Sequence, residues 1–252
     1  MRFIDLSVTI EGIPSEPEPA TIEYIDHREG AFILGKSVGL KDVDFPDGLA
    51  INLERISLTS HTGTHLDAPY HYGPMSEEKP SKTIEEIPLS WCYGNGVLID
   101  LSKNNIDEPV SKEEVHQYLE NINYTLQRND IVLINTGADK LWGEKEYFTN
   151  FRGISLDATE WILEHGIKII GVDSFGFDPP FYKMLQKYKE TGLKQYLWPA
   201  HLYGRKKEYC QIERLTNLSS IPKSTGFMVS CFPIKIKNCG AGWSRVVAMI
   251  ED

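Results

Sequence analysis

The sequence has few cysteines, no long apolar run and no targeting signal. Its 252 residues include four cysteines, and none belongs to a Cys-x-x-Cys pair. This spacing argues against a structural zinc knuckle, and in a chain of this length it also argues against a disulfide framework. No apolar run approaches the roughly 18 residues that a membrane-spanning helix needs. The first apolar run contains an acid and no small-residue cleavage site follows it, so we expect a soluble, cytoplasmic protein that is not processed.

The sequence also lacks an excess of positive charge. It has 26 Lys and Arg against 36 Asp and Glu, a formal net charge of -10 at pH 7. The longest basic run, residues 205–207, is too short to release the counterions on which nucleic acid binding depends. An acidic protein is also repelled by anionic lipid headgroups. We therefore expect neither nucleic acid nor a membrane as a partner.

No internal repeat, low-complexity tract or linker divides the chain, so we expect a single domain over residues 1–252. Residues 12–20 and 39–50 are rich in proline, glycine or acids and indicate loops. Short β-prone runs predict strands at residues 2–9, 31–38, 51–60, 96–101, 130–135, 167–172, 226–232 and 244–250.

Three segments have helical signals. Residues 111–122 begin with a serine and have a glutamate three positions later, which is a capping-box pattern. Residues 155–166 begin with a serine and end at a glycine, and residues 179–191 begin with proline. Strands outnumber helices and their order is mixed. We therefore expect an α/β fold with a mixed, largely antiparallel sheet rather than a regular doubly wound fold.

Three of the seven histidines lie within eleven residues, in the run HTGTHLDAPYH at positions 61–71. The residues before this run alternate between apolar and polar, which predicts a half-buried strand. If the extended conformation continues, His61, His65 and Asp67 share one face of that strand. Gly63 then leaves room for an ion between them.

Two imidazoles and one carboxylate suit zinc, and manganese or iron are alternatives because no thiolate selects a soft metal. Three protein ligands leave coordination positions open for water, as a catalytic site requires. His71 follows this set, and we consider it either a further ligand or a proton carrier beside the metal. A single histidine is more often structural. Burying the whole cluster without an ion, however, would leave several polar groups without partners.

The run at 61–71 resembles the HxGTHxDxPxH motif of the cyclase-like metal-dependent hydrolase family, which includes bacterial kynurenine formamidases and isatin hydrolases. Every fixed position of the motif is filled. The resemblance extends over nearly the whole chain, through IDLS at 4–7, LINTG at 133–137 and IGVDS at 170–174. In formamidase-like members a His and a Glu twelve residues apart complete a two-metal centre, and His201 and Glu213 have that spacing.

The resemblance implies a role for each of these residues. One metal is bound by His61, His65 and Asp67. A second is bound or bridged by Asp67, His201 and Glu213. The family also implies a swivelling β/β/α fold and a homodimer or homotetramer. It further implies one or two divalent ions per chain, with zinc expected and manganese as the alternative.

The implied activity is hydrolysis of a carbon–nitrogen bond in a linear or cyclic amide, a small-molecule substrate, by a metal-activated water. His71 is implied as the acid/base group that delivers a proton to the departing nitrogen. One alternative is a metal-dependent cyclisation or dehydration of a polyketide-like or other carbonyl substrate. Another is a metal-binding or ligand-binding protein without catalysis, against which His71 argues because a structural site needs no free base.

The chain departs from the family in its N-terminal loop. Formamidases have a Trp there, in a PxWPGD-like segment that packs on the aromatic substrate. Residues 12–19, GIPSEPEP, contain two acids and no aromatic residue, so we expect a substrate that is smaller, more polar or cationic. Asp173 and Asp178 either orient a ligand or cap a following helix. Trp198, close to His201, either lines the pocket or fills the core.

Overall fold

The computed structural model describes residues 1–104 and 108–251. In this part of the chain one sheet has nine strands in the order β1-β13-β11-β7-β8-β9-β10-β4-β12. The pairings β7–β8, β8–β9 and β9–β10 are parallel, and the remaining five are antiparallel. The expected mixed, largely antiparallel sheet is therefore confirmed. Its strands are β1 (Arg2–Asp5), β4 (His65–Asp67), β7 (Tyr93–Asp100), β8 (Ile131–Asn135), β9 (Ile169–Val172), β10 (Cys210–Glu213), β11 (Phe227–Ser230), β12 (Ala241–Trp243) and β13 (Val247–Ile250).

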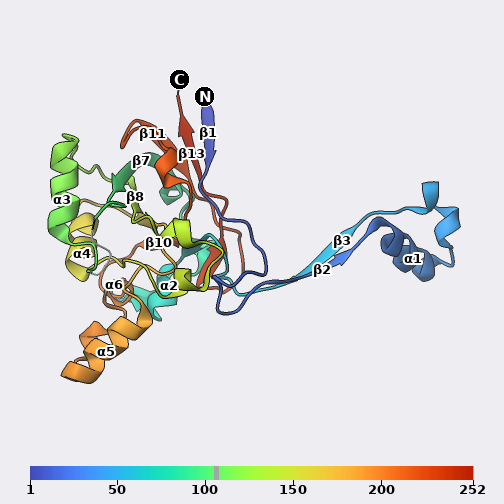
Figure 1. Cartoon of the computed structure of the whole chain (residues 1–252), viewed down its shortest axis with the longest axis horizontal. Helices are drawn as coiled ribbons and strands as arrows, with labels where there is room; N and C mark the ends of the chain where they lie inside the picture. Colours follow the sequence, from blue (N-terminus) through green and yellow to red (C-terminus); the bar gives the residue numbers. More distant parts are fainter. Residues whose placement is uncertain (105–107, 252) are drawn as a thin grey trace.

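The central parallel strands are buried on both faces. Every residue of β8 and β9 is buried, as expected for parallel strands covered on both sides. Val132 and Ile134 of β8 pack with residues of α3 (Lys112–Asn121), α4 (Leu156–Glu164) and α6 (Pro199–Tyr203). Ile131 and Leu133 point the other way, into a second cluster built mainly from strands, loops and short turns. Helices α3, α4 and α6 thus cover one face of the sheet (Figure 1).

The three predicted helices are confirmed, and two of them begin at the predicted caps. The Ser111 side chain accepts a hydrogen bond from the Glu114 amide, and the Glu114 carboxylate accepts one from the Ser111 amide. Ser155 caps α4 by accepting from the Ala158 amide. The third helix, α5 (Phe181–Thr191), follows two prolines and ends at Gly192, whose φ of 70° is a conformation that glycine adopts readily.

An arm formed by residues 21–57 projects from the body (Figure 1). Two antiparallel strands, β2 (Thr21–Ile25) and β3 (Leu53–Ser57), form its stem. They carry α1 (His27–Val38) and two short 3-10 turns, η1 (Asp42–Asp44) and η2 (Pro46–Gly48). The sequence did not indicate that this segment leaves the body.

Two of the predicted strands lie in the arm, and the structure corrects both predictions. The strand predicted at 31–38 is wrong, because these residues lie in α1. Asp26 caps this helix by accepting from the Arg28 and Glu29 amides, and Gly39 ends it with a φ of 75°. The strand predicted at 51–60 exists as β3, but it is exposed along its whole length rather than half-buried.

The remaining elements are short and connect the strands of the body. They are α2 (Pro69–Tyr72), β5 (Met75–Ser76), β6 (Lys79–Pro80), η3 (Ile84–Glu86), η4 (Leu89–Trp91), η5 (Ala138–Leu141), η6 (Lys145–Phe148), η7 (Lys194–Tyr196) and η8 (Leu218–Ser220). Among the residues that the structure describes, no helix combines the length and apolar character needed to cross a bilayer.

Candidate metal centre

Strand pairing brings three of the predicted ligands together. His65 and Asp67 are two residues apart on β4, so their side chains leave the same face of the strand. Glu213 of β10 lies directly opposite His65 in the antiparallel register. Directly opposite residues of an antiparallel pair project to the same face. The register alone therefore places these three side chains side by side.

His61 reaches the cluster from a turn, and the predicted continuous strand is wrong here. The turn is closed by the Thr62 amide, which donates to the Thr59 carbonyl at 3.1 Å. Gly63 has a φ of 67°, which favours glycine. A side chain there would meet Ile10 at 3.2 Å, so Gly63 permits a turn and does not leave room for an ion between the ligands. The turn places His61 Nδ1 3.0 Å from an Asp67 carboxylate oxygen.

The donor atoms of five residues converge around Asp67. His65 Nε2 lies 3.4 Å from Asp67 Oδ1 and 3.6 Å from Glu213 Oε2. His201 Nε2 lies 3.9 Å from Asp67 Oδ2 and 3.6 Å from Glu213 Oε1. Two groups have all their donor atoms within 4.8 Å of one another, namely His61 with Asp67 and His71, and His65 with Asp67 and Glu213.

The surroundings of Asp67 show most clearly whether these donor atoms suit a bound cation. Its side chain is fully buried, and neither carboxylate oxygen has a hydrogen-bond partner. Burial would raise the pKa of Asp67, but the neighbouring His71, His61 and His65 hold that pKa well below its usual value. A buried carboxylate without hydrogen bonds is costly unless a positive charge compensates it. The imidazole and carboxylate donors around it are those that zinc and related divalent ions take.

Asp178 fixes the orientation of His201. His201 Nδ1 donates to Asp178 Oδ2 at 2.7 Å, which leaves Nε2 facing Asp67 and Glu213. The same carboxylate accepts from the Ala200 and His201 amides at 2.8 and 3.0 Å, in the first turn of α6. Both roles considered for Asp178 are therefore present, although the helix is α6 and not α5. Burial lowers the pKa of His201, but the hydrogen bond and charge of Asp178 outweigh it and raise that pKa to about 9.

Hydrogen bonds also orient His65 and Glu213. The His65 Nδ1 atom lies 2.9 Å from the Gly63 carbonyl oxygen, which accepts the ring proton and leaves Nε2 free toward the carboxylates. Glu213 Oε1 accepts from the Phe177 amide at 2.8 Å. Backbone groups thus hold both side chains in the positions that a metal ligand would need.

His71 lies at the solvent-exposed rim of the cluster, on α2. Its ring centroid is 4.3 Å from that of His61 and 5.5 Å from that of His201. Although the side chain reaches solvent, the protein packed around the ring lowers the pKa of His71 to about 4, against the opposing charge of Asp67. His71 is therefore neutral at pH 7 and has a ring nitrogen that can accept a proton. This position is compatible with either of its two predicted roles.

A buried ion pair that the sequence did not predict supports the His61 turn. The Arg214 guanidinium donates to both carboxylate oxygens of Glu16, at 2.7 and 2.6 Å, and to the His61 carbonyl oxygen. Glu16 in turn accepts from the Gly63 amide at 2.9 Å. Arg214 has a φ of 62° and its guanidinium lies 4.0 Å from the Phe175 ring centroid. The pair joins positions 198 residues apart, so no local sequence pattern could have revealed it.

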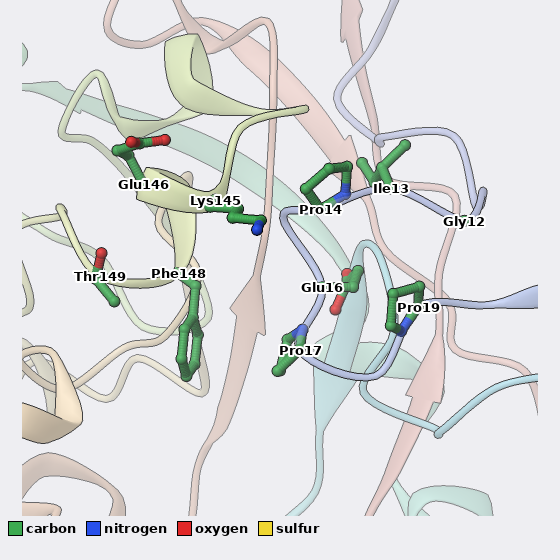
Figure 2. A pocket seen from close by; sticks show the side chains of 10 residues that line it. All are labelled: Gly12, Ile13, Pro14, Glu16, Pro17, Pro19, Lys145, Glu146, Phe148 and Thr149. Carbon is green, nitrogen blue, oxygen red and sulfur yellow. The ribbon is translucent and has the colours of Figure 1, made fainter.

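The N-terminal loop borders an open hollow of about 670 Å³ next to this ion pair (Figure 2). Glu16 is one of the two acids counted in this loop, and because Arg214 neutralises it, it offers no free charge to a cationic substrate. Glu18 is exposed. The loop has no aromatic residue, but Phe148 of η6 lines the opposite side of the hollow.

The two other residues considered from the sequence are Asp173 and Trp198. Asp173 accepts from the amides of Thr136 and Gly137, and it therefore anchors the loop that follows β8. Trp198 does not fill the core, because it is 42% exposed and stacks on Phe181 with a ring-centroid distance of 5.1 Å.

Comparison with known proteins identifies a family. A family model named Cyclase and described as "Putative cyclase" matches residues 4–179, a range that includes the run 61–71 but neither His201 nor Glu213. Cyclase-like protein 3 of Arabidopsis thaliana is 29% identical over 137 residues, which cover 54% of this chain and 48% of that protein. Kynurenine formamidase of Bacillus mycoides (strain KBAB4) is 27% identical over 131 residues, 52% of this chain and 54% of that enzyme. The chain thus spans about half the length of these two relatives.

A crystal structure of an isatin hydrolase bound to the product analogue thioisatinate superposes on the whole chain. The TM-score is 0.79 with 18% sequence identity, covering 100% of this chain and 93% of that one. At this identity the likeness establishes a shared fold. The family resemblance inferred from the sequence is confirmed.

Proposed function

The chain belongs to the Cyclase family, and on this premise we propose that it is a metal-dependent hydrolase that cleaves a carbon–nitrogen bond of a linear or cyclic amide. The observation that carries the proposal is the fully buried Asp67 carboxylate, which accepts no hydrogen bond from any described residue and lies among imidazole and carboxylate donors. The neutral His71 at the solvent-exposed rim supports a catalytic rather than a structural centre.

The residues proposed to hold metal are His61, His65, Asp67, His201 and Glu213. One or two divalent ions per chain are proposed, with zinc favoured over manganese because the set has three imidazoles. A divalent ion held there would polarise a substrate carbonyl and lower the pKa of a water molecule. A cytoplasmic location is also part of the proposal.

The chain's own residues would position the ligands and move the proton. Asp178 keeps His201 Nε2 directed at the carboxylates, and the Glu16–Arg214 pair holds the turn that carries His61. In amide hydrolysis a carbon–oxygen bond forms and the carbon–nitrogen bond breaks. His71 would accept a proton from the attacking water and deliver it to the nitrogen, which leaves as an amine.

The hollow beside the Glu16–Arg214 pair is the proposed entry for the substrate. None of the five proposed ligands lines it, and its connection to the candidate centre is Glu16, which accepts from the Gly63 amide between His61 and His65. The N-terminal wall of the hollow consists of proline, glycine, isoleucine and glutamate residues, and Phe148 supplies an aromatic surface from the other side. We propose a small or polar amide as the substrate, because the N-terminal loop has no aromatic residue and, of the described residues that line the hollow, one, Phe148, carries an aromatic ring.

The test combines metal analysis with a substrate panel. Purified protein is assayed for bound metal, then with N-formyl amines and cyclic amides before and after chelation, in water enriched in heavy oxygen. We expect chelation to abolish turnover. We also expect the acid product to contain one oxygen atom from the solvent. His116→Ala is the matched control, since His116 is an exposed histidine on α3 that lies beside Glu120 and Trp161.

The alternative is a metal-dependent cyclase or dehydratase acting on a carbonyl substrate, and it is favoured by the names of the family and of the plant relatives. In that case product would form without incorporation of solvent oxygen. Bound metal with no turnover on any amide or carbonyl substrate would instead point to a binding protein.

A further inference from the structure

Four side chains leave neighbouring positions on one face of the sheet, and three of them are candidate ligands. In the antiparallel pairing of β4 with β10, His65 lies opposite Glu213. The next pair on the same face is Asp67 and Gln211. Residues two apart on a strand share a face, and so do residues directly opposite in an antiparallel pair. Gln211 is therefore the fourth member of this group, next to Asp67 across the pair and to Glu213 along the strand.

The Gln211 side chain is fully buried, and its amide oxygen has no hydrogen-bond partner among the residues that the structure describes. A buried carbonyl oxygen without a donor costs free energy, so packing alone would favour an apolar side chain at this position. Asp67 shares this situation, since neither of its carboxylate oxygens has a hydrogen-bond partner in the described part of the chain. Three buried oxygens thus lie on two adjacent side chains, and a cation would compensate all three.

A chain of hydrogen bonds fixes which end of the Gln211 amide faces the ligands. The Tyr209 hydroxyl donates its proton to the Ala200 carbonyl oxygen at 2.7 Å, and that carbonyl can only accept. Tyr209 is therefore an acceptor toward Gln211, and the amide nitrogen Nε2 donates to it at 2.5 Å. Tyr209 and Glu213 lie two positions before and after Gln211. With Nε2 directed at Tyr209, the Oε1 end of the amide is left for the side on which Glu213 and Asp67 lie.

Tyr209 also connects Gln211 to the helix that carries His201. Its ring stacks on the Tyr72 ring with a centroid distance of 5.4 Å, and the Tyr72 ring lies 5.5 Å from the His201 ring. The Ala200 carbonyl that accepts from Tyr209 belongs to the residue before His201 in α6. A five-residue helix has little stability of its own, so such contacts from outside help to hold it. The amide of Gln211 and the ring of His201 are thus held by one set of contacts.

We propose that Gln211 is a further ligand of the metal centre, where its Oε1 atom supplies a neutral oxygen donor beside Asp67, and that Tyr209 is the positioning residue that directs it. The inference rests on the metal centre of the proposed function. Carboxylate and carbonyl oxygens suit manganese, whereas zinc is satisfied by four ligands and binds well to imidazole. Gln211 therefore raises the affinity of the centre for manganese relative to zinc.

The test measures the Kd for Mn²⁺ and for Zn²⁺ separately, by competition with a chromophoric chelator and without any substrate. Gln211→Leu removes the oxygen and keeps a side chain of comparable size. It should weaken the binding of Mn²⁺ by about 10–100-fold and that of Zn²⁺ by less. Gln117→Leu is the matched control, because Gln117 is exposed on α3 and its replacement should leave both Kd values unchanged.

Two further variants separate a ligand from a structural residue. Gln211→Glu keeps an oxygen donor, so it should bind Mn²⁺ at least as tightly as the wild type does. Its metal-free form should melt at a lower temperature, because two adjacent buried carboxylates repel each other. Tyr209→Phe leaves Oε1 in place and removes the bond that directs the amide, so it should cost less affinity for Mn²⁺ than Gln211→Leu.

Unchanged Kd values in Gln211→Leu overturn the inference, and so do equal losses for both ions that Tyr209→Phe matches. Weaker binding of Mn²⁺ by Gln211→Glu also overturns it, and this result decides the question if Gln211→Leu does not fold. A wild type that binds neither ion overturns the proposed function as well. A wild type that binds metal, with variants that bind it equally well, overturns the role of Gln211 alone.

Discussion

Glu213 lies directly opposite His65 in the pairing of β10 with β4, although 148 positions separate them in the sequence. This register places a carboxylate oxygen 3.6 Å from His65 Nε2. Strand β4 pairs with β10 on one side and with β12 on the other, so backbone hydrogen bonds on both sides set its register. Three of the candidate ligands, His65, Asp67 and Glu213, are therefore built into the sheet.

Removing the Asp67 carboxylate should abolish stabilisation by metal. Added zinc should raise the melting temperature of the wild type by about 5–10 °C, since a ligand at a hundred times its Kd contributes about 2.7 kcal/mol. Asp67→Asn should show no such shift. Glu120→Gln, an exposed acid on α3, is the control and should respond as the wild type does. A full zinc shift in Asp67→Asn would place the ion elsewhere.

Metal binding should release a proton from His201. The pKa of His201 in the metal-free protein is raised to about 9, so below pH 9 its ring is protonated and the proton competes with the metal. Metal affinity should therefore rise as the pH increases from 7 to 9, by about tenfold per unit for one proton. Calorimetry in buffers of different ionisation enthalpy measures the protons released.

Asp178→Asn provides the matched variant for that experiment. It removes the charge that raises the pKa of His201, so fewer protons should be released at pH 7. Affinity at pH 9 should still fall by about 10–100-fold, because the ring loses its orienting partner. Affinity that does not change between pH 7 and 9 in the wild type would contradict a protonated His201.

His71→Ala should lower kcat for an amide substrate by about 10²–10⁴ while metal content stays unchanged. A protonated His71 can no longer accept a proton, so activity should fall when this ring is protonated. Because the pKa of His71 is lowered to about 4, this fall in activity should be visible only as the pH approaches 4. An ester with a phenolate leaving group needs no protonation to depart, so its hydrolysis should lose less. Equal losses for amide and ester would argue against proton delivery to the nitrogen.

Glu16→Gln should destabilise the protein by about 3–5 kcal/mol, because it leaves Arg214 as a buried charge without its anionic partner. Metal affinity should fall as well, since the His61 turn loses its support. Chemical unfolding and metal titration measure the two effects. Glu18→Gln is the matched control two residues away in the same loop, where the side chain is exposed and should cost less than about 0.5 kcal/mol.

Local features of the sequence were enough to predict several elements correctly. The helices at 112–121 and 156–164 begin at serines whose caps depend on residues three positions away, and such short-range bonds are visible in the sequence. The cluster at 61–71 was found for the same reason, since its three histidines and one aspartate lie within eleven residues. His201 and Glu213 were reached only through family resemblance, because nothing in their own neighbourhood predicts a ligand.

The tertiary structure decided how these pieces meet. Strands β4 and β10 have three and four residues, too few for a periodic pattern, so their pairing could not be predicted. Residues 31–38 were predicted as a strand because they include a run of apolar residues. The sequence shows that these residues are apolar, but it does not show whether another part of the molecule covers them. The sequence by itself determined which donor groups are available and where helices begin, since both depend on near neighbours. The register of the sheet, the Glu16–Arg214 pair and the projecting arm depend on contacts between distant residues, and only folding brings those together.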